Sequence, residues 1–271
     1  MILTPENYYS REASLEYMSV SQYKSFLSCE AATIAALNGE LEQETKEAFL
    51  EGSFVHAWSE GALDKFIINH PEIISSRGPS KGELKAGFKK CEEMIAVLEN
   101  DPYCMFVLQG DKEITVTADL FGTKWKGKID VLNADRGYFV ELKTARSISE
   151  TAWMWSEAQN KNIKVSFIEQ YNYMVQAAVY AELERLQSGR DKWLDPVMVA
   201  VTKEDPPDHS VINLKDHERM AEELEKVKQN MPRILAVKSG AEPPHRCGMC
   251  KYCRATKRIE KMIYYTELMP A

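Results

Sequence analysis

The residue types and spacing most suited to chemistry lie in one short segment. Asp130 is separated by ten residues from Glu141-Leu142-Lys143, and a polar break at residues 133–137 divides two runs rich in β-branched and aromatic residues. This pattern predicts a β-hairpin. Because side chains alternate between the faces of a strand, Glu141 and Lys143 should point the same way and Leu142 into the opposite layer. Asp130 on the partner strand can reach the face of the charged pair.

Two carboxylates beside a lysine suit the hydrolysis of a phosphodiester. That reaction needs neutralisation of charge on the scissile phosphate and a deprotonated attacking water. Carboxylate oxygens are ligands for Mg²⁺ or Mn²⁺, and Lys143 can orient the water or help to deprotonate it. The structural alternative is a surface ion pair between Glu141 and Lys143. The apolar surroundings in Tyr-Phe-Val-Glu-Leu-Lys argue against it, since charges in a core strand are costly to desolvate without a functional return.

The elements that would position these residues are predicted from periodicity and capping signals. Ser19 to Gln22 forms a capping box for a first helix that ends near Cys29. Further helices are expected over about 44–68, 81–99, 167–187 and 216–237, and further strands over about 113–118, 196–202 and 209–214. The order predicts an α/β (α+β) protein, with a central mixed β-sheet flanked by helices.

Composition and charge narrow the class of protein. The chain has 271 residues, of which 44% are hydrophobic and 28% charged, as in ordinary globular proteins. It contains no apolar run of membrane-spanning length and no signal-peptide pattern at its start, so we expect a cytoplasmic protein. The net charge of −7 argues against nonspecific coating of nucleic acid, although 245–261 forms a basic patch. Cys91 and Cys104 look isolated and are expected in the core.

Four further polar residues gain meaning from their order in the chain. Glu113 starts the strand before the hairpin, and His56 follows Gly52 by one helical turn. Gln176 and Tyr180 are four residues apart and share one helical face. Taken alone, each is better explained as a solvated strand end or a packed core residue.

In this order the motifs resemble the PD-(D/E)XK nuclease superfamily, specifically its RecB-like and RecE-like phage-type exonucleases, which include exodeoxyribonuclease VIII-like proteins. The resemblance covers most of the chain and implies a restriction-endonuclease-like fold. It implies a single nuclease domain over 1–271, with a helical part at about 19–100, a nuclease core at about 105–215 and a C-terminal helix and cysteine segment at 216–271. Ile129 stands where the superfamily name has a proline, a position that varies among RecB-like members.

The resemblance also implies roles for individual residues. The metal ligands for Mg²⁺ or Mn²⁺ would be His56, Glu113, Asp130, Glu141 and the carbonyl of Leu142. Lys143 would position the nucleophilic water, while Gln176 and Tyr180 would help to hold the substrate strand. The implied activity is hydrolysis of DNA from double-stranded ends during recombination or repair. A single-strand annealing protein as partner and a homo-oligomer are implied as well.

Three thiols at two-residue spacings, Cys247, Cys250 and Cys253, form a second candidate site. Thiolates so close together ordinarily share a metal. Cys29 is the natural fourth ligand, and His245 is its rival. One remote cysteine followed by three near the C-terminus resembles the iron–sulfur nuclease domains of AddB and CRISPR-associated relatives, in which the cluster pins the chain ends together. A [4Fe-4S] cluster is therefore expected, with Zn²⁺ or reduced structural thiols as alternatives.

Two other functions fit the same motifs. One is a CRISPR-associated or AddB-like single-strand DNA nuclease built on the same core. The other is a DNA-binding scaffold with an inactive nuclease fold. Against the scaffold, none of the acids nor the lysine expected of the active site is missing from the sequence.

Overall fold

The computed structural model of the chain describes residues 1–41, 47–156, 159–259 and 261–268. Its strands are β1 (Asp111–Leu120), β2 (Thr123–Asn133), β3 (Tyr138–Ala145), β4 (Thr151–Ser156), β5 (Lys161–Ser166), β6 (Asp195–Thr202) and β7 (His209–Asn213). Its helices are α1 (Arg11–Glu16), α2 (Val20–Ser28), α3 (Glu30–Leu37), α4 (Glu47–Ser59), α5 (Leu63–Asn69), α6 (Ala86–Glu99), α7 (Pro102–Val107), α8 (Phe167–Gln170), α9 (Tyr173–Ser188), α10 (His217–Lys238) and α11 (Lys251–Ala255), with 3₁₀ turns η1 (Pro71–Ile73) and η2 (Tyr265–Leu268).

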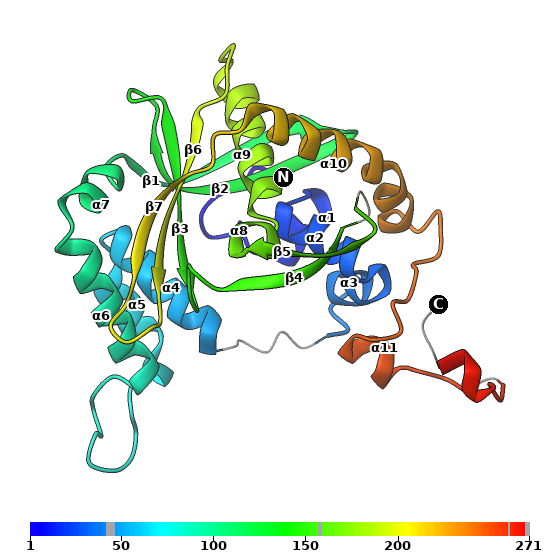
Figure 1. Cartoon of the computed structure of the whole chain (residues 1–271), viewed down its shortest axis with the longest axis horizontal. Helices are drawn as coiled ribbons and strands as arrows, with labels where there is room; N and C mark the ends of the chain where they lie inside the picture. Colours follow the sequence, from blue (N-terminus) through cyan, green and yellow to red (C-terminus); the bar gives the residue numbers. More distant parts are fainter. Residues whose placement is uncertain (42–46, 157–158, 260, 269–271) are drawn as a thin grey trace.

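A mixed sheet lies at the centre of the molecule. Within the described residues, five strands pair in the order β1-β2-β3-β6-β7, and β4 pairs with β5 in a separate hairpin. β1, β2 and β3 form an antiparallel meander, β3 is parallel to β6, and β7 returns antiparallel to β6. Figure 1 shows helices on both sides of this sheet. The predicted α/β fold with a central mixed sheet is confirmed.

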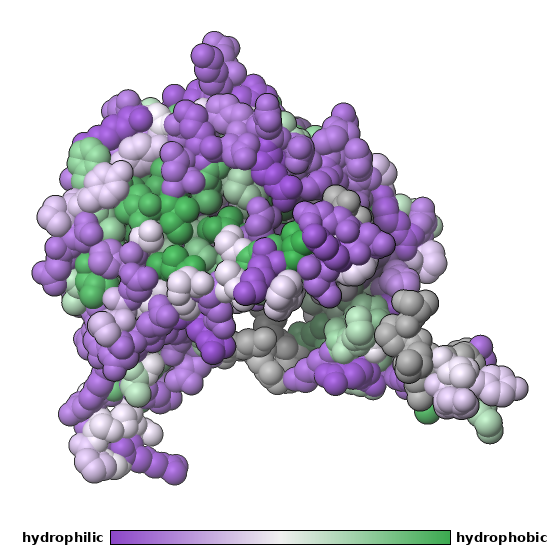
Figure 2. Space-filling view, viewed as in Figure 1, coloured by the Kyte–Doolittle hydropathy of each residue, from purple (hydrophilic) through white to green (hydrophobic). Residues whose placement is uncertain are grey.

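Each face of the sheet has its own hydrophobic core. Phe139 of β3 packs with residues of α2, α9 and α10, whereas its neighbours Val140 and Leu142 pack with residues of α4 and α6. Both layers therefore follow from the period-two alternation of β3. Hydrophilic side chains cover the outer face over α10, at the upper right of Figure 2.

The predicted helices are present, but several are interrupted. Ser19 caps α2 by accepting a hydrogen bond from the backbone N–H of Gln22 at 3.2 Å, and Cys29 ends that helix. The helix expected over 44–68 is divided into α4 and α5 near Gly61, whose φ of 71° is left-handed. Its expected start at Glu44 lies outside the described residues.

Similar corrections apply to two later helices. The helix expected over 167–187 is divided into α8 and α9 by Asn172, whose φ is 51°. The helix expected from 81 begins only at Ala86. Short elements with their own capping signals were not predicted: Ser10 caps α1 and Asp101 caps α7. The β4–β5 hairpin was not predicted either.

A segment near the C-terminus packs against α3, which lies in the N-terminal part of the chain. Helix α11 contacts α3, and the backbone N–H of Ala31 donates to the carbonyl of His245 at 3.0 Å. Figure 1 shows the segment after α10 descending to this contact. Within the described ranges, no helix combines the length and apolar character needed to cross a membrane.

Candidate active site and cysteine centre

The hairpin strands diverge at Asp130. β2 and β3 pair only beside the turn, from Asn133–Tyr138 to Val131–Val140. At the next position, Oδ2 of Asp130 accepts a hydrogen bond from the backbone N–H of Leu142 at 2.7 Å. The Asp130 side chain thus replaces the backbone hydrogen bond expected between the strands at this point. Beyond it β2 and β3 diverge, and the space between them, at Asp130, Glu141 and Lys143, is called here the fork. The sequence pattern predicted the hairpin, but not that its ladder stops at this acid.

Glu141 lies in the fork, and its two carboxylate oxygens differ in their hydrogen bonding. Its Oε2 accepts hydrogen bonds from Lys143 Nζ at 2.8 Å and from Gln176 Nε2 at 2.5 Å. Its Oε1 is buried and has no hydrogen-bond partner among the described residues. A buried acceptor without a partner is unfavourable unless a ligand completes it. The free oxygen is therefore suited to a cation.

A second group of ligand atoms faces the same fork. Nδ1 of His56 lies 3.3 Å from Oδ1 of Asp130, and one ligand atom each from His56, Glu113 and Asp130 fall within 4.8 Å of one another. Glu113 has a φ of 55°, which is uncommon for a residue with a side chain. Imidazole and carboxylate ligands at this spacing fit a divalent cation.

The charges in the fork are strongly coupled. Burial and then the nearby Asp130 carboxylate raise the pKa of Glu141 to about 7. Burial disfavours the charged form of Asp130, but His56, Lys143 and the Leu142 N–H together hold the pKa of this carboxyl below its usual range. Burial likewise opposes a charge on Lys143, yet Glu141 and Asp130 together raise the lysine pKa. Lys143 is therefore a charged donor at neutral pH.

A cleft of about 850 Å³ opens onto these groups. The sequence-predicted residues that line it are His56, Glu113, Asp130, Glu141, Lys143, Gln176 and Tyr180. Leu142 is the exception, because its side chain is buried in the opposite core as expected. Tyr8 and Tyr9 of the N-terminal segment also line the cleft.

Tyr180 is held by a glycine on the adjacent strand. A Cβ at Gly127 would lie 2.9 Å from Cε1 of Tyr180, so only glycine leaves room for the ring. Burial raises the pKa of Tyr180 well above its usual value, which keeps the phenol neutral. Gly52 is less restrictive, since a Cβ there would meet only Thr144 Oγ1 at 3.5 Å.

Several residues of the cleft were not predicted. Glu60 follows His56 by one helical turn, and burial together with the charge of Glu113 raises the pKa of its carboxyl. Lys128 forms an ion pair with Glu113 and lies under the ring of Tyr9. The i, i+4 spacing from His56 could have identified Glu60. The spacing of two from Lys128 to Asp130 could have identified the lysine.

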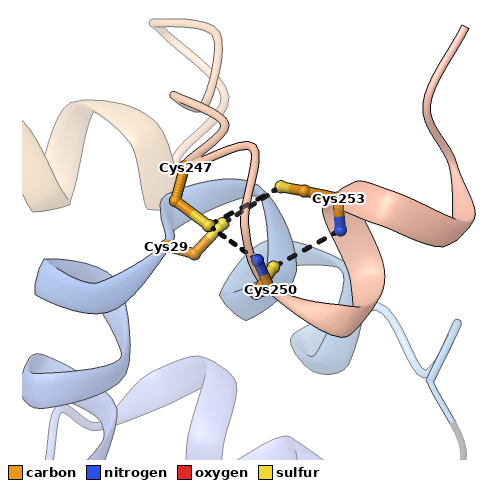
Figure 3. Close-up of side chains that lie close together, drawn as sticks. All are labelled: Cys29, Cys247, Cys250 and Cys253. Carbon is orange, nitrogen blue, oxygen red and sulfur yellow. Dashed lines mark hydrogen bonds between the residues drawn. The ribbon is translucent and has the colours of Figure 1, made fainter. Parts of the chain in front are cut away.

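The cysteine centre forms as the sequence predicted. Sγ of Cys29 lies 3.5 Å from Sγ of Cys253, Sγ of Cys247 lies 4.0 Å from Sγ of Cys253, and the four thiols including Cys250 fall within 4.8 Å of one another. Figure 3 shows Cys29, between α2 and α3, beside the three cysteines in and before α11. His245 is not in this group of the described residues. Of the two candidates, Cys29 is thus the one that lies beside the three C-terminal cysteines.

Backbone amides donate to two of the sulfur atoms, and burial raises the pKa of Cys253 to about 11 while that of Cys247 is lowered. The N–H of Cys250 donates to Sγ of Cys247, and the N–H of Cys253 donates to Sγ of Cys250, each at 3.3 Å. The hydrogen bond from Cys250 contributes most to lowering the pKa of Cys247, to about 6. Such a donor set fits a metal that prefers sulfur. By contrast, Cys91 and Cys104 are buried in the core, as expected.

Comparisons with known proteins agree with this geometry. Residues 19–256 match the family described as "PDDEXK-like domain of unknown function (DUF3799)". A crystal structure titled "Putative exonuclease" from Eubacterium rectale shares 40% sequence identity and a TM-score of 0.88, over 99% of this chain and 98% of that chain. The structure named SSO0001 has 15% identity and a TM-score of 0.30, over 86% of this chain and 91% of that chain, and is too different to carry an argument. No curated protein matches the chain.

The family match covers the helices before the sheet, the fork and the cysteine centre in one stretch. The matched crystal structure extends the agreement to nearly the whole chain. The resemblance inferred from Asp130, Glu141 and Lys143 is therefore confirmed at the level of the fold. The chain belongs to the PDDEXK-like family DUF3799, within the PD-(D/E)XK nuclease superfamily.

Proposed function

We propose that the protein is a Mg²⁺- or Mn²⁺-dependent exonuclease that hydrolyses phosphodiester bonds at the ends of duplex DNA, in recombination or repair. The observation that carries the proposal is the buried, unpartnered Oε1 of Glu141 beside Asp130 and a charged Lys143. The name of the similar protein from Eubacterium rectale supports the same chemistry.

The chain's own residues would divide the work as follows. His56, Glu113, Asp130, Glu141 and the carbonyl of Leu142 would hold the metal. The metal would supply charge neutralisation on the phosphate and a more acidic bound water. Lys143, which stays protonated, can donate a hydrogen bond to the water or to a phosphate oxygen but cannot accept a proton.

Two further residues would act on these groups. Gln176 donates to the same oxygen of Glu141 as Lys143 does, and so fixes the carboxylate with Oε1 left without a partner among the described residues. Tyr180, packed on Gly127, would form part of the wall against which the substrate strand lies.

The test is digestion of end-labelled linear DNA in the presence of Mg²⁺, with Lys143→Ala and Glu141→Gln as variants. We expect wild type to release nucleotides and each variant to be slower by at least about 100-fold, the size of effect seen when a transition-state donor is removed. Lys228→Ala is a matched control, because Lys228 is exposed on α10 and pairs only with Glu225 among the interactions described.

The AddB-like single-strand nuclease is the second candidate, and the cysteine centre favours it. Labelled single-stranded and double-stranded substrates of the same sequence distinguish the two, and labels at either end give the polarity. Tight binding of DNA by metal-loaded wild type without any cleavage would instead support an inactive scaffold.

The cysteine centre is proposed to be structural and to hold a [4Fe-4S] cluster or Zn²⁺. Metal analysis and the visible spectrum of anaerobically purified protein distinguish iron from zinc. Protein that folds normally and contains neither metal would contradict the proposal.

We also propose a homo-oligomeric, cytoplasmic protein that works with a single-strand annealing protein, as the resemblance to RecE-like exonucleases implies. Light scattering after size exclusion tests the first point. A monomeric mass at all concentrations would contradict it.

A further inference from the structure

A second cavity adjoins the catalytic cleft. It has a volume of about 640 Å³ and extends along α2 to Cys29 and Cys250. It shares Tyr9, Ser14 and the serines at the start of α2 with the cleft. The two cavities are therefore adjacent. This second cavity, called here the α2 groove, is lined by Tyr9, Arg11, Ser14, Ser19, Ser21, Gln22, Ser25, Ser28, Cys29, Ala32, Thr33, Ala36, Leu37, Gly39, Leu41 and Cys250.

The α2 groove differs from the cleft in its charge. Its described lining contains Arg11 and no aspartate or glutamate, although the whole chain carries a net charge of −7. The cleft, in contrast, is lined by carboxylates of Glu60, Glu113 and the fork together with the lysines Lys65, Lys126, Lys128 and Lys143. A wall that carries an arginine and no carboxylate does not repel a polyanion.

Hydroxyl groups follow the floor of the α2 groove. Ser21, Ser25 and Ser28 are spaced by four and three residues, so they share one face of α2, and all three are exposed. Ser25 Oγ donates to the carbonyl of Ser21 at 2.9 Å, and rotation about χ1 would redirect it toward the groove. Serine hydroxyls are common donors to phosphate oxygens in protein–nucleic acid contacts.

The N-terminus of α2 lies where the two cavities join. Ser19 caps the helix, Ser21 lies in its first turn, and that turn contains no acidic residue. The positive end of the helix dipole and its free N–H groups favour an anion at this point. A phosphate placed there would lie between the fork and the row of serines.

We propose that the α2 groove binds the phosphodiester backbone of a single strand of DNA as it passes from the catalytic fork toward the cysteine centre. The inference deepens the proposed nuclease function and rests on it. A volume of about 640 Å³ is that of a small-molecule pocket, roughly 300–1,000 Å³, so it holds a few nucleotides of one strand and not a duplex.

The test measures binding without cleavage, by fluorescence anisotropy in buffer with a metal chelator. The probes are fluorescein-labelled oligothymidylates of about 4 and about 16 nucleotides, the range of single-strand site sizes. The variant Ser25→Glu/Ser28→Glu places two negative charges in the α2 groove. The control is Leu27→Glu, which adds a negative charge to the same helix. Lys24 is left unchanged because it donates to the Tyr171 carbonyl. Leu27 is 56% exposed on the same helix and does not line the groove.

We expect the double variant to bind the long probe at least about tenfold more weakly, with binding by the Leu27→Glu variant little changed. Ser28→Lys is a second variant with the opposite sign. It should tighten binding of the long probe and steepen the slope of log K against log salt by about 0.7. Melting curves verify that each variant is folded.

Equal affinity of wild type, Ser25→Glu/Ser28→Glu and Ser28→Lys for the long probe would overturn the inference. Equal losses in the double variant and in Leu27→Glu would also overturn it, since they would reflect general charge. The binding assay does not depend on cleavage, so the two proposals can fail separately. If binding depends on the serines but the protein has no nuclease activity, the proposed function is wrong and the groove proposal stands. If the protein cleaves DNA but its binding does not depend on the serines, the groove proposal is wrong and the proposed function stands.

Discussion

Glu141 is the residue whose surroundings say most about the site. One carboxylate oxygen is held by Lys143 and Gln176, and the other is buried without a partner among the described residues. Burial raises the pKa of this acid to about 7, whereas His56 keeps that of Asp130 low. The two acids therefore differ in protonation in metal-free protein, although their residue types are nearly the same.

This difference predicts a pH dependence of stability in metal-free protein. An unfolded Glu141 releases its proton near its ordinary pKa, but the folded protein keeps the proton up to about pH 7. Its contribution to the free energy of unfolding is complete at low pH and is lost as the pH rises through 7. Glu141→Gln has no such loss. Its stability relative to wild type should therefore improve between pH 5 and pH 8, by on the order of 1 kcal/mol.

Urea denaturation of both proteins at several pH values in chelator measures this difference. His56 titrates in both proteins, so the comparison with wild type isolates Glu141. Adding Mg²⁺ should stabilise wild type more than the variant, which lacks one of the proposed ligands. A constant difference between the two proteins across this pH range would contradict the assignment.

At the scale of elements, the strands of the hairpin could be predicted and their divergence could not. The turn at 133–137 and the alternation of β3 are local signals, and both are present in the structure. The fork depends on Asp130 accepting from the Leu142 backbone, a contact between strands. The approach of His56 depends on how α4 packs against the sheet. The breaks at Gly61 and Asn172 depend on left-handed residues that periodicity does not reveal.

The contact between β2 and α9 gives a prediction with a matched control. Gly127→Ala would bring a methyl group to 2.9 Å from the Tyr180 ring, so we expect a loss of about 1–3 kcal/mol in unfolding free energy. Gly52→Ala meets only ordinary contact and lies in a helix, where alanine is favoured over glycine by about 1 kcal/mol. It should be neutral or stabilising.

Denaturant unfolding of the two variants measures this contrast. Combining Gly127→Ala with Tyr180→Ala should be less destabilising than the sum of the single changes, because the second removes the ring that the first displaces. Equal stability of Gly127→Ala and wild type would mean that the α9–β2 contact does not constrain Tyr180.

At the scale of the whole molecule, the cysteine centre joins segments that are far apart in sequence. Cys29 and Cys253 are 224 residues apart in the sequence, and the distance between their Sγ atoms is 3.5 Å. The spacing of the three C-terminal cysteines predicted that their thiols lie together, with Cys29 favoured over His245 as the fourth group. The packing of α11 on α3 brings Cys29 to them.

Removal of one ligand should therefore separate these segments. We expect Cys253→Ser to lower the bound metal per chain and the unfolding temperature by several degrees, and to make residues 245–256 more sensitive to proteolysis. Cys91→Ala is the control, because it removes a buried core thiol outside the centre. It should reduce stability while the metal content stays the same. Equal metal content in Cys253→Ser and wild type would contradict the assignment.

The most direct test of the account is the release of nucleotides from linear duplex DNA by wild type and Lys143→Ala, with Mg²⁺ and with chelator. The account predicts rapid release by wild type with Mg²⁺, none with chelator, and at least about a 100-fold loss in the variant. A covalently closed circle should be resistant. Equal rates in the two proteins, or no release by wild type with its metal fully loaded, would contradict it.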